Sequence, residues 1–217
     1  MNRNPRLQSS ILVAGELLLL ISSSAWAHMR EASTWPVWLF VILLGAGGYT
    51  LVGASDRRWH IAYGAGCVTA IGFGLLGDTM PLFKGLSSIA FAFSFYLLFR
   101  AVVKHCFFKS SVIQLDRILG GVAGYLLLGF FWMTQFSWAT LANPDAFVRV
   151  ATGEAATPDE LLYFSFVTLM SLGYGDFVPT TSPARLIAML NGLSGVLYLA
   201  MFVASLIGRT QVTRERS

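Results

Sequence analysis

Charged residues are scarce in this sequence. They occupy 12% of its 217 positions, whereas hydrophobic residues occupy 55%. A soluble domain carries about 25% charged residues, so this composition is too apolar for a protein that folds in water. The sequence therefore predicts a membrane protein.

Cysteines and polar linkers are also few. We expect Cys67 in mid-membrane and Cys106 at the cytoplasmic end of a helix, so no disulfide is expected between them. The linkers between apolar segments are short, and low-complexity tracts are absent. We therefore expect no soluble ligand-binding or enzymatic domain.

Apolar runs long enough to cross a bilayer as a helix, which takes about 20 residues, occur six times. A seventh run, Leu161–Met170, is too short to span. The sequence predicts an all-α membrane protein with six transmembrane helices and a re-entrant helix and loop between the last two. We place a domain boundary near Asp116, between a four-helix region (1–115) and a C-terminal part (116–217). The six predicted spans are Ile11–Ala27, Trp35–Ala54, Trp59–Leu76, Leu82–Phe99, Ile118–Leu141 and Leu186–Ile207.

Lysines and arginines test this division independently, because short cytoplasmic loops hold most of them. With the N-terminus inside, eleven fall on the cytoplasmic side and only four on the outer side: Arg30, Lys84, Arg149 and Arg185. This asymmetry predicts a multi-pass protein of the cell (inner) membrane with both termini in the cytoplasm. Because topology explains the net charge of +4, we expect no nucleic-acid partner.

The N-terminus leaves two alternatives. Its basic start, apolar middle and Ala25-Trp26-Ala27 ending resemble a secretory signal peptide with a cleavage site. However, Glu16 lies in the apolar region, where an acid is costly. We therefore favour a retained first helix, and the later spans keep the same orientation in both cases.

A strong helix-start signal precedes the short apolar run. Thr157 fits the N-cap, Pro158 fits the first helical position, and Glu160 completes a capping box. About 13 helical residues give a length of roughly 20 Å, which enters a membrane without crossing it. Such re-entrant backbone is tolerated only where it is buried in protein or lines water.

Two glycines follow this helix in the stretch Ser-Leu-Gly-Tyr-Gly-Asp, residues 171–176. Gly173 and Gly175 can adopt positive φ without steric cost, which allows successive carbonyls to turn to one side. Carbonyl oxygens that face an axis are ligands for a dehydrated cation. A glycine turn would explain the four letters Gly-Tyr-Gly-Asp alone, but their place after a half-length helix and between two spans favours an ion filter.

The stretch Thr168–Asp176 resembles the selectivity filter of the potassium channel superfamily, and the flanking helices resemble its two-helix pore domain. The resemblance implies a potassium-selective channel in the lipid bilayer, in which a homotetramer surrounds one axis and K⁺ is the permeant ion. It places Asp176 at the outer mouth, and it puts Tyr163 and Phe164 where some relatives have tryptophans that brace the filter. The residues implied to bind K⁺ are Ser171, Leu172, Gly173, Tyr174 and Gly175.

The last predicted span would line the inner cavity of such a channel. Gly195 falls at the family's gating-hinge position, although glycines on a membrane helix also permit close packing, and both alternatives stay open. The candidates for the cavity wall, at helical spacing, are Val196, Leu199 and Val203.

The sequence leaves two alternative functions. A non-selective cation channel is one alternative, although Gly-Tyr-Gly resembles the potassium-selective members. Gly192-Leu193-Ser194-Gly195 resembles the serine motif of rhomboid-type intramembrane proteases, but no histidine follows His105 to activate Ser194. A voltage sensor needs several cations along one span, and the fourth has only Lys84 and Arg100 at its ends. We therefore expect a channel that is not an enzyme and has no recognisable voltage sensor.

Overall fold

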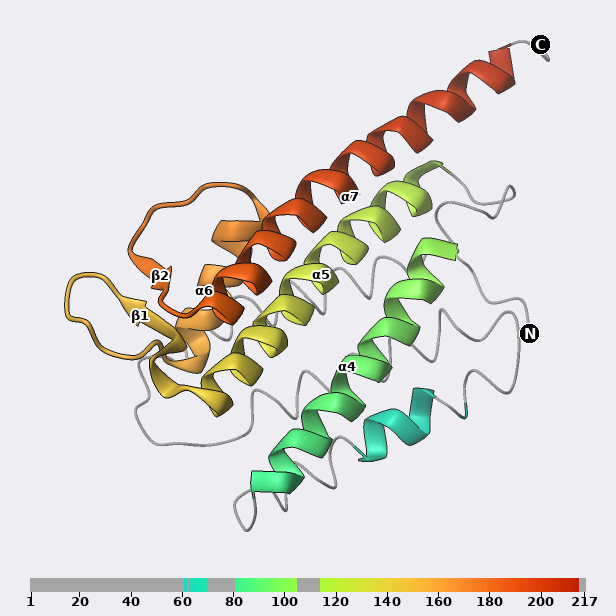
Figure 1. Cartoon of the computed structure of the whole chain (residues 1–217). Coiled ribbons are helices and arrows are strands. Elements are labelled where there is room, and N and C mark those ends of the chain that lie inside the picture. The colour runs from blue at the N-terminus through green and yellow to red at the C-terminus, as the bar shows by residue number, and fades with distance from the viewer. Residues whose placement is uncertain (1–60, 62, 70–80, 105–113, 215–217) are drawn as a thin grey trace. The chain divides into compact units, whose positions relative to one another are not determined.

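The computed structural model of the chain describes residues 61, 63–69, 81–104 and 114–214 (Figure 1). The first two predicted spans, Ile11–Ala27 and Trp35–Ala54, lie outside the described residues, and so does Glu16. The third predicted span is described only at residues 61 and 63–69, which are helical. The six-span topology therefore stays a prediction.

The chain divides into two compact units, residues 1–127 and 128–217. The described part of the first unit includes helix α4 (Pro81–Val103), which matches the predicted fourth span. Its side chains Phe95 and Leu98 are buried, and Gly66 packs directly on the Ser94 hydroxyl. The division falls inside the next helix, so the predicted domain boundary near Asp116 also stays a prediction.

Two long helices, α5 (Gln114–Ala142) and α7 (Ser182–Arg214), form at the positions of the last two predicted spans. Each contains a stretch long and apolar enough to cross a membrane, Arg117–Ala142 and Ser182–Ile207. Helices that are apolar on nearly all sides belong in a membrane or in a large core. Their length and composition agree with a membrane protein.

Helix α6 (Pro158–Leu169) is the predicted short helix, and it begins at the predicted residue. The capping box is present: the Glu160 carboxylate accepts a hydrogen bond from the Thr157 N–H at 2.9 Å, and the Thr157 side chain faces the N–H of Glu160. Its 12 residues give a length of roughly 18 Å at 1.5 Å per residue, too short to cross a bilayer. The prediction of a helix of half the spanning length is confirmed.

A small sheet departs from the all-α expectation. After the 3₁₀ turn η2 (Pro144–Ala146), strand β1 (Phe147–Arg149) pairs antiparallel with β2 (Phe177–Pro179), so that Arg149 lies opposite Phe177. Residues 147–156, here called the 147–156 hairpin, turn back at Gly153 and bond Phe147 again through the N–H of Ala156. Figure 1 shows both strands and α6 gathered near the adjoining ends of α5 and α7. The described part of the chain is mostly helical, as predicted, and this small sheet is an addition that the sequence did not predict.

Aromatic side chains form the core of the second unit. The ring of Phe136 on α5 lies 4.8 Å from that of Phe147 on β1 and 5.3 Å from that of Phe164 on α6, centroid to centroid. Burying one such side chain stabilises the fold by about 1.5–3 kcal/mol. This core holds the sheet, α6 and α5 together, and its members are Phe136, Ala146, Phe147, Leu161, Phe164, Phe177 and Ala184.

Buried polar groups connect the three helices of this unit. The Ser165 hydroxyl on α6 lies 2.9 Å from the carbonyl oxygen of Gly129 on α5. The side-chain amide of Asn191 on α7 donates to the Ser165 carbonyl oxygen at 3.0 Å, and both Ser165 and Asn191 are fully buried. This bond, accepted by a carbonyl in the interior of α6, joins α7 to the middle of α6.

We predict that Asn191→Ala lowers the thermal unfolding temperature in detergent, because it removes the only side-chain donor that the described residues give to the Ser165 carbonyl. The loss should be about 1–3 kcal/mol, typical of a buried polar group left without its partner. Ser205→Ala on the same helix, where the hydroxyl bonds only its own turn, is the control. Equal melting of both variants would contradict this role of Asn191.

Candidate functional site

The backbone after α6 alternates between positive and ordinary φ. Ser171 has φ 58°, Gly173 has φ 57° and Gly175 has φ 77°, whereas Leu172 and Tyr174 between them have no positive φ. An alternation of this kind is what allows successive carbonyls to face the same side. The predicted ion-binding residues therefore form one continuous stretch of unusual backbone.

Ser171 owes its conformation to the end of α6. Its N–H donates to the Thr168 carbonyl at 3.0 Å, and the N–H of Leu172 donates to the Val167 carbonyl at 2.9 Å. These two bonds form a Schellman motif, in which the left-handed position is usually glycine. A serine there costs about 1–2 kcal/mol of backbone strain. Sequence reasoning missed this feature, because no glycine marks the helix end.

The stretch 171–176 is open within one chain. Leu172 is 49% exposed and Tyr174 is 66% exposed. A Cβ placed on Gly173 or Gly175 would meet no atom of the described chain within 4 Å. The exposed side chains of Leu172 and Tyr174 are therefore available for contact with other molecules.

Asp176 is the last residue of the stretch and accepts hydrogen bonds from two backbone N–H groups. Its carbonyl oxygen accepts from the N–H of Val150 at 2.9 Å, and its carboxylate accepts from the N–H of Phe177 at 3.2 Å. The hydroxyl of Tyr163 on α6 is near the same carboxylate, which adds to burial in raising the pKa of Tyr163. Its role in bracing the filter, which the resemblance implies, stays a prediction.

Comparison with known proteins gives one finding. Residues 118–211 match a protein-family model described as "Ion channel". This segment is similar to ion channels. The match covers somewhat less than half of the chain, from the first turns of α5 through α6, the stretch 171–176 and most of α7. It supports an ion channel in a membrane rather than an enzyme. Searches among curated proteins and among solved structures found no match.

Helix α7 of this ion-channel segment presents two different faces. One face is buried and carries Ala184, Asn191, Gly195 and Tyr198 at helical spacing. The candidate wall residues lie on another face, with Val196, Leu199 and Val203 exposed at 54%, 45% and 51%. These three side chains do not pack against the core of their own chain, so they are available to line a cavity or contact another chain.

Gly195 lies against the end of α6. A Cβ on Gly195 would overlap the carbonyl oxygen of Leu169, two residues before Ser171, whereas a Cβ on Gly192 would lie 3.6 Å from the nearest atom, the Thr168 carbonyl oxygen. The geometry thus gives Gly195 a packing role at the base of the stretch. Its role as a gating hinge stays a prediction.

Ser194 makes two structural hydrogen bonds. Its oxygen accepts from the indole N–H of Trp132 at 2.8 Å and donates to the Asn191 carbonyl at 2.7 Å. A serine nucleophile instead needs its proton directed at a general base. The observed bonds join α5 to α7 and use the hydroxyl that a protease would need free.

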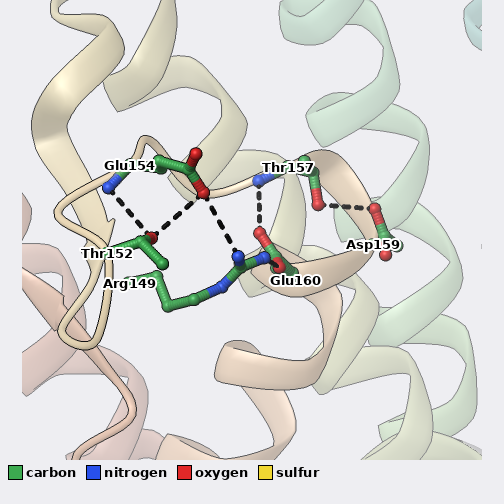
Figure 2. A network of polar contacts seen from close by, with 6 residues as sticks. All are labelled: Arg149, Thr152, Glu154, Thr157, Asp159 and Glu160. Atoms are coloured by element: carbon green, nitrogen blue, oxygen red, sulfur yellow. Dashed lines mark hydrogen bonds and ion pairs between the residues drawn. The ribbon is translucent and has the colours of Figure 1, made fainter.

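An ion-pair network surrounds the start of α6, as Figure 2 shows. The Arg149 guanidinium bonds the Glu160 carboxylate and lies 3.3 Å from the Glu154 carboxylate. The hydrogen bond to Glu160 is the main cause that raises the pKa of Arg149. Burial alone would raise the pKa of Glu160, but the N–H of Thr157 and the guanidinium of Arg149 outweigh it, so this pKa is lowered.

Two substitutions test the packing of α7 on α6. We predict that Gly195→Ala destabilises the protein by about 1–3 kcal/mol, as expected when a methyl group is forced against backbone. Gly192→Ala should be neutral or slightly stabilising, since its methyl has room and alanine favours helix by about 1 kcal/mol. Thermal unfolding of both purified variants measures the difference. Equal effects would contradict the close contact at Gly195.

A pH series tests the Glu160 network. Because the folded-state pKa of Glu160 lies below its usual 4.5, its carboxylate contributes stability above about pH 4.5 that is lost as pH falls through the lowered value. The informative quantity is the difference in unfolding temperature between wild type and Glu160→Gln at each pH. We expect the unfolding temperatures of the two proteins to converge below pH 4. A constant difference down to pH 3 would contradict the lowered pKa.

Proposed function

We propose that the chain is a subunit of a tetrameric, potassium-selective channel that conducts K⁺ passively across the cell membrane. The observation that carries the proposal is the alternating backbone of residues 171–175 directly after a helix of half the spanning length. In this proposal K⁺ is bound by the carbonyl oxygens of Ser171, Leu172, Gly173, Tyr174 and Gly175 and by the Ser171 hydroxyl.

The end of α6 supports a cation at this place. A helix carries about half a negative charge at its C-terminus, where its last carbonyls lack partners. At the end of α6 the Schellman bonds use two of these carbonyls, while Ser171 and the residues after it leave the helix axis. Four such helix ends around an axis stabilise a cation that has lost part of its water.

The open surface of the stretch supports a ring of chains. One chain supplies one re-entrant segment, which covers only one side of an ion, and oligomers with closed cyclic symmetry are the common solution. The exposed side chains of Met170, Leu172 and Tyr174 give each chain apolar surface for such a contact. In the ring, the exposed face of α7 with Val196, Leu199 and Val203 would line the inner cavity.

The orientation follows from charge. With the lysine and arginine excess inside, both termini are cytoplasmic, the 147–156 hairpin and Asp176 face outward, and the carboxylate of Asp176 concentrates cations at the outer mouth. A non-selective cation channel is the second candidate function, because the same carbonyl geometry binds other cations with altered spacing.

Ion flux from purified protein in liposomes tests the proposal. We expect K⁺ uptake well above Na⁺ uptake. Equal uptake of the two ions would identify the non-selective alternative, and no uptake of either would refute a channel that is open under these conditions.

A pair of glycine substitutions tests the filter assignment. Gly173 and Gly153 both have positive φ and open space for a methyl group, so alanine costs each of them about 1–2 kcal/mol of strain. Only Gly173 lies in the proposed filter. We expect Gly173→Ala to abolish K⁺ flux and Gly153→Ala, in the 147–156 hairpin, to retain most of it. Normal flux in Gly173→Ala would contradict the assignment.

A further inference from the structure

We propose that Arg149 is a positioning residue that fixes both ends of the re-entrant segment 158–176 at once. The inference rests on the proposed function for its consequence in ion selection, but its structural part can be tested without ion flux. Arg149 stands outside the segment, at the end of β1.

The backbone of Arg149 and its neighbours holds the outer end of the stretch. Arg149 lies opposite Phe177 in the β1–β2 ladder, and the next residue, Val150, donates its N–H to the Asp176 carbonyl at 2.9 Å. The guanidinium carbon lies 5.9 Å from the centroid of the Phe177 ring, a distance typical of a cation–π contact. Asp176 is thus held by the main chain next to β1, and Phe177, the residue after the re-entrant segment, by the side chain of Arg149.

The Arg149 side chain reaches the other end of the segment. Its guanidinium bonds the carboxylate of Glu160, the third residue of α6, whose other oxygen caps the N–H of Thr157 (Figure 2). Arg149 therefore bonds the start of the re-entrant helix and lies against Phe177, the residue that follows the re-entrant segment. Between these two anchors the chain runs down through α6 and back through residues 171–176.

The two carboxylates that contact Arg149 are not equivalent. The side chain of Glu160 is 17% exposed, whereas that of Glu154 is 70% exposed, and its distance from the guanidinium is 3.3 Å. Exposed ion pairs contribute little because water and salt screen them. The bond to Glu160 is therefore the one that holds the segment, and Glu154 provides a matched control.

The consequence concerns the distance between the carbonyls of the filter. A re-entrant loop held at both ends cannot lengthen or twist without breaking one anchor. When Arg149 is neutralised, the outer residues Tyr174 and Gly175 lose the restraint transmitted through Asp176. Coordination then adapts to ions of other sizes, so K⁺ selectivity falls while the chain stays folded.

Hydrogen–deuterium exchange of the purified full-length protein directly tests whether Arg149 holds both ends of the segment 158–176. In Arg149→Gln and in Glu160→Gln, whose amide can still cap Thr157, we expect the Val150 N–H to exchange at least about tenfold faster, as for loss of one charge-assisted bond. Glu154→Gln should exchange like the wild type. Unchanged exchange in both Arg149→Gln and Glu160→Gln would overturn the proposal, whatever the flux experiments show.

The ratio of K⁺ to Na⁺ uptake in liposomes tests the consequence. We expect this ratio to fall in Arg149→Gln and Glu160→Gln, to be kept in Glu154→Gln, and to recover in the exchanged pair Arg149→Glu with Glu160→Arg. A wild type without K⁺ selectivity would refute the proposed function, and the exchange experiment would then decide alone whether Arg149 holds both ends of the segment 158–176. A selective wild type with an unchanged ratio in both single variants would refute the positioning role alone.

Discussion

The second unit is organised by one constraint: backbone that enters a membrane without crossing it must satisfy its polar groups inside the protein or against water. Helix α6 meets this constraint along its length through its own hydrogen bonds, and its start is closed by Thr157 and Glu160. The last carbonyls of α6 cannot be capped by side chains in the same way, because the chain has to turn back after them. The Schellman bonds at Ser171 satisfy part of the helix end, and the carbonyls that follow are those that we propose to bind K⁺.

Much of this arrangement could be predicted from the sequence, because each part has a local signal. The helix start is indicated by a capping pattern whose side chains act within one turn, namely Thr157, Pro158 and Glu160. The apolar runs of α5 and α7 are long enough to be recognised in the sequence as helices that could span a membrane. The glycines at 173 and 175 indicate positive φ, and both positions have it.

The parts that were missed depend on contacts between distant residues. Strands β1 and β2 have three residues each, too few to show a period of two. They are separated by the 27 residues 150–176, and they pair because Phe147 and Phe177 share a core with Phe136. Ser171 adopts a glycine conformation without being glycine, since the helix end and the following stretch impose it. The close packing at Gly195 could not be predicted from the sequence, because its neighbour, the Leu169 carbonyl, is on another helix.

The same reasoning explains why the buried face of α7 carries small and polar residues. Gly195 lets α7 approach the last turn of α6, and Asn191 donates a hydrogen bond to a carbonyl in the middle of α6. The Ser194 hydroxyl accepts a hydrogen bond from the Trp132 indole on α5. Hydrophobic side chains in these positions would hold the helices apart, since lipid offers no hydrophobic force to bring them together. The opposite requirement holds for Val196, Leu199 and Val203, which need no partner in their own chain. A movement of α7 would therefore reach the base of the 171–176 stretch through Gly195 and Asn191, while the 147–156 hairpin holds its other end.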